Sequence, residues 1–99
     1  MQIRNSQMIT QIEGKLIEKN PAYVVIDCNG LGYLVNVSLN TYSKISTINT
    51  GDKCKLYTHF SIQENVHTGE TVQSLYGFSD VQERMLFRHL ISVSGISAS

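Results

Sequence analysis

Histidine and cysteine are the residues of this sequence that could bind a metal ion or act as nucleophiles. His59, His67 and His89 are scattered, and none stands at zinc-ligand spacing from Cys28 or Cys54. A Cys–His nucleophile pair stays geometrically open, although nothing in the spacing favours it. The sequence has no Gly-x-x-x-x-Gly-Lys-Ser/Thr loop that could hold the phosphates of ATP. We therefore expect no metal site, no cofactor and no catalytic residue.

Six aromatic residues could stack with nucleic-acid bases on the surface of a β-barrel. The alternative is that most of them fill the barrel or its ends. We read no basic residues as interleaved with them, and this favours the packing role. The six residues are Tyr23, Tyr33, Tyr57, Tyr76, Phe60 and Phe78.

A polar segment contains two carboxylates that stand apart from the other charges. Glu64 is followed by Asn65, and Glu70 comes a few residues later, next to Gly69. The segment lies between two apolar alternating stretches, so it reads as the tip of a hairpin. Composition alone assigns these side chains to a solvated loop.

The elements that position these residues are mostly strands. Asn29-Gly30 between two apolar runs is a strong signal for a tight hairpin turn, and Gly14 indicates a bulge or bend. Residues 39–45 read as a short helix or a turn. Five strands with one helical insertion predict a small closed barrel, most plausibly an OB-fold. The expected strands cover residues 11–19, 22–28, 31–37, 54–63 and 72–78.

Alternation within these strands predicts the barrel core, and a change of period predicts a helix after residue 78. Ser79 and Gln82 have capping-box spacing, and Asp80 adds negative charge at the helix start. Gly95 is a plausible end of the helix. The broad apolar face of this helix needs a covering partner; it consists of Leu86, Phe87, Leu90, Ile91 and Val93. The expected core residues are Ile12, Leu16, Val25, Val35, Leu56, Phe60 and Phe78.

Composition limits the classes of protein that fit. The chain has 99 residues, 41% of them hydrophobic and 16% charged, as in an ordinary small globular domain. No apolar run reaches the roughly 20 residues of a membrane span, and residues 1–10 lack a secretory h-region. With two cysteines there is no disulfide framework, so a cytoplasmic protein is expected. Eight basic and eight acidic residues cancel, which lowers the odds of nucleic-acid binding unless another segment supplies the affinity.

Several stretches, in order, resemble the N-terminal part of the RuvA family. They are Met8-Ile-Thr-Gln-Ile-Glu-Gly-Lys-Leu-Ile-Glu-Lys19, Asn29-Gly-Leu-Gly-Tyr33, Thr58-His-Phe60, Leu75-Tyr-Gly-Phe78 and Gln82-Glu-Arg84, with Leu86-Phe87 and Leu90-Ile91. The resemblance covers residues 8–99. Residues 1–7 have no counterpart and read as an unpatterned extension.

The resemblance implies a fold and a function. RuvA proteins begin with an OB-like barrel, here residues 8–78, and continue into a helix-hairpin-helix domain, of which residues 79–99 would be the truncated start. They are non-catalytic scaffolds that bind four-way Holliday-junction DNA in recombination and repair, as homotetramers. Branch migration is driven by the ATPase RuvB, which contacts a C-terminal domain that this chain lacks. The RuvC resolvase is a further candidate partner.

The resemblance also implies two sites. The first is an acidic pin at the hairpin tip, usually Arg-Glu-Asp, which Gln63, Glu64 and Asn65 match here. Only Glu64 keeps its charge, the following loop is longer than usual, and Glu70 is a candidate for the lost carboxylate. The second is a Gly-Val-Gly-Pro-Lys hairpin whose amides bind phosphate. The motif here reads Gly95-Ile96-Ser97-Ala98-Ser99, with Ser97 at the usual second glycine. The DNA-binding residues that it implies are Ser94, Gly95, Ile96 and Ser97.

Two other functions remain open from the residues alone. One is a general OB module that binds single-stranded nucleic acid. The other is a barrel that binds proteins and not nucleic acid, which the zero net charge favours. A junction-binding scaffold would prefer four-way junctions, and a general OB module would prefer single strands.

Overall fold

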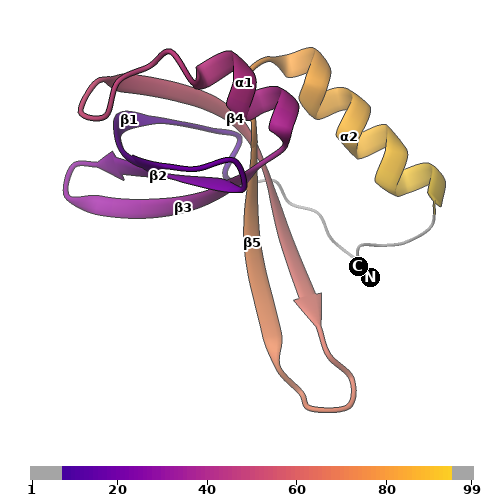
Figure 1. Cartoon of the computed structure of the whole chain (residues 1–99). Coiled ribbons are helices and arrows are strands. Elements are labelled where there is room, and N and C mark those ends of the chain that lie inside the picture. The colour runs from indigo at the N-terminus through magenta and orange to yellow at the C-terminus, as the bar shows by residue number, and fades with distance from the viewer. Residues whose placement is uncertain (1–7, 95–99) are drawn as a thin grey trace.

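The chain forms a closed β-barrel followed by a helix (Figure 1). The structure is a computed structural model that describes residues 8–94. Its strands are β1 (Gln11–Lys19), β2 (Tyr23–Cys28), β3 (Leu31–Val37), β4 (Lys53–Glu64) and β5 (Thr71–Phe78). The helices are α1 (Leu39–Ile45) and α2 (Val81–Ser94).

The strand order around the barrel is β1-β2-β3-β5-β4, and β4 closes the ring by pairing with β1. All neighbours are antiparallel except β3 and β5, which are parallel. The helix α1 lies in the chain between β3 and β4. This is a five-stranded barrel of the OB type, so the predicted fold class is confirmed.

The turn between β2 and β3 forms as its sequence predicts. Asn29 and Gly30 both have positive φ, at 54° and 91°. The Asp27 carboxylate accepts a hydrogen bond from the Gly30 amide at 2.7 Å. Gly14 has another role than the predicted bulge, because the β1–β2 register shifts between Leu16 and Glu18. A Cβ at Gly14 would lie 2.3 Å from the carbonyl oxygen of Asp27, so glycine is needed there for close strand approach.

The barrel interior is a contiguous apolar cluster with two buried threonines. Val25 was predicted to belong to it, and this is wrong: Val24 and Ile26 point inward, and Val25 is half-buried. Phe60 is only partly buried against the cluster. Phe78 is buried but lies against α2, outside the contiguous cluster. The cluster is Ile12, Leu16, Val24, Ile26, Val35, Ile45, Cys54, Leu56 and Leu75.

The helix α2 begins one residue later than its sequence pattern predicts. The carboxylate of Asp80 accepts a hydrogen bond from the Glu83 amide at 2.8 Å, so the cap is Asp80 with Glu83 and not Ser79 with Gln82. That hydrogen bond is the main reason that the pKa of Asp80 is lowered, and Lys44 adds to it. The predicted start of a new domain at residue 79 stays a prediction.

The predicted apolar face of α2 divides between two environments. Phe87 and Ile91 are half-buried, whereas Leu86 and Leu90 are 58% and 57% exposed. Nothing within residues 8–94 covers these two leucines. The side chain of Val93 and the helix-ending Gly95 lie outside the part that the structure describes.

Candidate nucleic-acid interface

The hairpin formed by β4 and β5 projects far beyond the barrel (Figure 1). Its strands stay paired from Tyr57 and Phe78 to Glu64 and Thr71. Near the barrel, Leu75 belongs to the core, but Ile62 is already 59% exposed. The outer half of the hairpin therefore extends into solvent beyond the barrel core, with β4 and β5 paired along it.

Asn65 organises the tip of the hairpin. Its side-chain oxygen accepts hydrogen bonds from the amides of His67 at 2.9 Å and Thr68 at 3.3 Å. Its own amide donates to the carbonyl of Glu70 at 2.8 Å, and its carbonyl accepts from Gly69 at 2.7 Å. Gly69 has a φ of 76°, which favours glycine. The longer loop is thus a turn with a defined shape, and Asn65 has a structural part in it.

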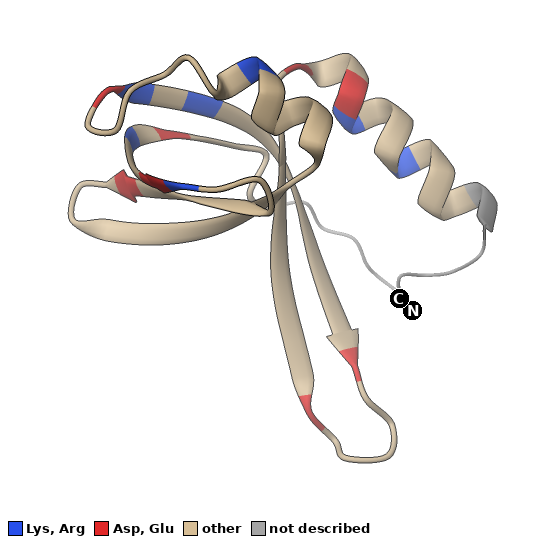
Figure 2. Cartoon of the chain, in the orientation of Figure 1, with Lys and Arg blue, Asp and Glu red and all other residues tan. Residues whose placement is uncertain are grey.

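The two carboxylates predicted at the tip lie at its two ends. Glu64 ends β4 and Glu70 immediately precedes β5, and both are exposed. Figure 2 shows these two acidic positions at the far end of the hairpin, well away from the basic residues. A tip of this charge repels phosphates, so it adds no affinity for DNA. Its use as a pin stays a prediction.

Four rings form a seam between α2 and the strands of the hairpin. The Phe87 ring lies 5.4, 5.3 and 5.1 Å from the rings of His59, Tyr76 and Phe78. Tyr57, at the border of this seam, has two cations near its ring, Lys55 and Arg84. The prediction that basic residues are not interleaved with the aromatics is therefore wrong. Lys55 precedes Tyr57 by two residues on β4, whereas Arg84 comes from α2, after the last of these aromatics in the chain.

Glu83 joins α2 to α1. Its carboxylate accepts hydrogen bonds from the hydroxyls of Ser79 at 2.9 Å and Thr41 at 3.1 Å, and from the side-chain amide of Asn40. Lys44 lies 3.9 Å from it and 3.3 Å from Asp80. Burial opposes ionisation of Glu83, but these hydrogen bonds outweigh it and lower its pKa.

Two arginines hold the other side of α2. Arg84 donates to the carbonyl of Thr10 at 2.7 Å. Arg88 donates from Nε to Nδ1 of His59 at 3.1 Å and from Nη2 to the carbonyl of Thr58 at 3.4 Å. Burial, and then the charge of Arg88, lowers the pKa of His59, which keeps its ring neutral and able to accept that bond. The sequence analysis did not predict the hydrogen bonds made by these two arginines or by Glu83. The available signal was the pair Glu83-Arg84 with Arg88 one turn later.

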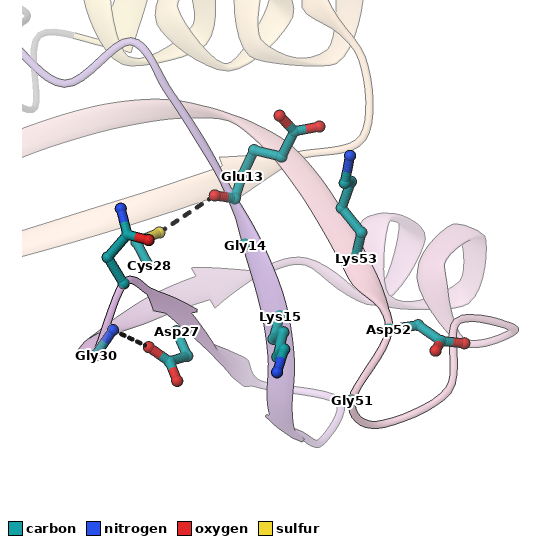
Figure 3. A pocket seen from close by; sticks show the side chains of 10 residues that line it. Glu13, Gly14, Lys15, Asp27, Cys28, Gly30, Gly51, Asp52 and Lys53 are labelled. Carbon is teal, nitrogen blue, oxygen red and sulfur yellow. Dashed lines mark hydrogen bonds between the residues drawn. The ribbon is translucent and has the colours of Figure 1, made fainter.

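Neither cysteine has the surroundings of a nucleophile. Cys54 is 1% exposed, and burial raises the pKa of its thiol. Cys28 donates to the carbonyl of Glu13 at 3.3 Å, beside an open depression of about 630 Å³ at one end of the barrel (Figure 3). Residues 8–94 contain no group of three side chains that could hold a metal ion. The helices in that range are too short or too polar to cross a bilayer.

Most of the second predicted site follows α2. Ser94 is the last residue of α2 and of the range that the structure describes. The predicted phosphate-binding residues Gly95, Ile96 and Ser97 lie outside the described residues.

Comparison with known proteins agrees with the barrel and its hairpin. Residues 8–77 match the family described as RuvA N terminal domain. The chain is 49% identical over 92 residues to the "Holliday junction branch migration complex subunit RuvA" of Christiangramia forsetii. It is 52% identical over 92 residues to the proteins of that name from Flavobacterium psychrophilum and Bacteroides fragilis.

These alignments cover 93% of this chain in each case. They cover only 43%, 43% and 41% of the three relatives, so the chain spans about two fifths of their length. The matched region is the barrel with its long hairpin, and similarity to the relatives continues into α2. The chain therefore belongs to the RuvA N-terminal domain family.

Proposed function

We propose that this chain is the barrel part of a scaffold subunit that binds Holliday junctions during branch migration in recombination and repair. The observation that supports it most is the projecting hairpin with Glu64 and Glu70 at its tip, in a chain about 50% identical to RuvA subunits. An acidic projection near DNA acts through geometry, because its charge opposes binding. Several such tips at a junction centre would push the strands apart and keep the arms unfolded.

The subunit is non-catalytic in this proposal. An ATPase of the RuvB type supplies the motor through a C-terminal domain, four subunits assemble on the junction, and a RuvC-type resolvase is a further candidate partner. The complex works in the cytoplasm. The main affinity for DNA comes from the helix-hairpin-helix domain that begins at α2. Two sets of hydrogen bonds support this role, those of Glu83 to α1 and those of Arg84 to the barrel. They fix the direction in which α2 leaves the barrel.

The test uses the longer protein that carries the following domain. Binding to a labelled four-way junction is measured in competition with a linear duplex and with a single strand. A strong preference for the junction is expected. A preference for the single strand would support a general OB module, and binding to none of them would support a protein-interaction barrel.

The acidic tip is tested in the same assay with Glu64→Gln. Because Glu64 is exposed, stability should change by less than about 0.5 kcal/mol. Junction affinity should hold or increase, and motor-driven branch migration should change. The control is Gln73→Glu, the reverse exchange of the same two side chains, which adds a negative charge on β5 closer to the barrel. A large loss of junction affinity in Glu64→Gln would contradict a repulsive role.

A further inference from the structure

One side of the barrel carries cations that no carboxylate neutralises. Lys53 and Lys55 are exposed on β4, where inward positions belong to Cys54 and Leu56. Successive outward side chains on a strand are about 6.8 Å apart, a separation close to that of neighbouring phosphates along a DNA strand. Neither lysine has an ion-pair partner among residues 8–94.

Tyr57 continues this row and brings in a third cation from α2. Lys55 and Arg84 lie 5.1 and 5.8 Å from the centre of the Tyr57 ring. Arg84 is anchored through Nη1 to the carbonyls of Thr10 and Thr58. Its Nε and Nη2 donors have no partner among the described residues, so they can bind an oxyanion. We refer to Lys53, Lys55, Tyr57 and Arg84 as the β4 cationic strip.

The surrounding carboxylates do not cancel the strip. Glu13 is opposite Lys55 in the β1–β4 register, but no ion pair joins them. Figure 3 shows Glu13 and Lys53 extending to the same side, while Asp52 extends in another direction. Three cations therefore face one carboxylate, and the acidic hairpin tip is far from them in Figure 2.

We infer that the β4 cationic strip binds the sugar–phosphate backbone of a double-stranded DNA arm. Charge complementarity selects the ligand. The duplex is favoured over a single strand because Tyr57 is the only ring of the strip, and the neighbouring rings are packed against Phe87, so bases have few partners for stacking. The inference rests on the proposed function and adds a contact on the barrel itself.

The test is the salt dependence of binding by this 99-residue chain. Affinity for a fluorescein-labelled linear duplex, and for a four-way junction of the same sequences, is measured over a series of NaCl concentrations. With three phosphate contacts, log K against log[NaCl] should have a slope of about −2.7. Removing two of them in Lys53→Gln/Lys55→Gln should leave about −0.9 on both DNAs. Lys53→Arg/Lys55→Arg should keep the original slope.

Lys44→Gln is the control for loss of a positive charge, because Lys44 lies on α1 and pairs with Asp80 and Glu83. It should leave the slope unchanged, and unfolding midpoints verify that each variant is folded. The inference is overturned if the double variant keeps the slope of the parent, or if the parent does not bind duplex at low salt.

Failure of the strip and failure of the proposed function give different results. If the longer protein prefers junctions while the double glutamine variant keeps its slope, the scaffold function stands and the strip is wrong. If the slope falls as expected but the longer protein has no preference for junctions, the strip stands and the scaffold function is wrong.

Discussion

Removing the carboxylate of Glu83 should destabilise the chain more than most surface changes. The Glu83 side chain is 17% exposed and accepts hydrogen bonds from Ser79, Thr41 and Asn40. Thr41 is 0% exposed, so Glu83→Ala leaves a buried hydroxyl without this acceptor, at about 1–3 kcal/mol. Hydrogen bonds to a charged group are worth about 1.5–3 kcal/mol each, but Asn40 is exposed, so its bond contributes less.

Together these effects predict a loss of about 2–4 kcal/mol for Glu83→Ala. In a domain of this size that lowers the melting temperature by roughly 8–32 °C. Urea unfolding followed by circular dichroism measures the change, and thermal melts check it. Glu70→Ala is the matched control, because it removes an exposed carboxylate and should cost less than about 0.5 kcal/mol. If the two variants are equally stable, the hydrogen bonds of Glu83 to α1 do not stabilise the packing of α2.

Three further changes test the fold. Phe60→Ala should cost about 1.5–3 kcal/mol in urea unfolding, less than full burial would give, since Phe60 is half-buried; an unchanged midpoint would contradict its packing against the core. Gly77→Ala should cost about 1–3 kcal/mol because its Cβ would lie 2.5 Å from Val35, whereas Gly32→Ala meets only an ordinary 3.5 Å contact and should be mild; equal losses would refute this. Asp80 and Glu83 have folded pKa values below their ordinary 3.8 and 4.5, so their stabilisation is present above about pH 4.5 and is lost as pH falls through the folded values. The melting temperature should therefore decrease between pH 7 and pH 3, and this decrease should be smaller in Glu83→Gln.

Local patterns were sufficient to predict the order and type of the elements. Polar turns interrupt each alternating run, and the Asn29-Gly30 pair favours a tight turn because both residues adopt positive φ. Strand β2 shows where this reasoning ends. Because Val24, Val25 and Ile26 are all apolar, alternation could not decide which of them face inward, and only pairing with β3 and β1 settles it.

The site was predictable at the hairpin and not at α2. A polar segment between two apolar strands predicts a hairpin tip from local sequence alone. The hydrogen bonds between α1 and α2 instead join residues that are distant in the chain, such as Thr41 and Glu83 at a separation of 42. Nothing in the local sequence indicates which polar side chains will meet across such a distance. The same holds for Arg84, the second cation near Tyr57, because it reaches the ring only when α2 packs against β4.

Zero net charge is weak evidence against nucleic-acid binding when the charges are segregated. The formal charge of this chain cancels over eight basic and eight acidic residues. In space, Glu64 and Glu70 occupy the hairpin tip, Asp80 and Glu83 are engaged by Lys44, and Lys53 and Lys55 have no ion-pair partner among the described residues (Figure 2). Interactions between exposed charges are screened beyond about 8–10 Å at ordinary ionic strength, so DNA near β4 experiences the lysines and not the distant tip. In the proposed function one surface attracts DNA and another repels it, so the net charge summed over the sequence says little about either surface.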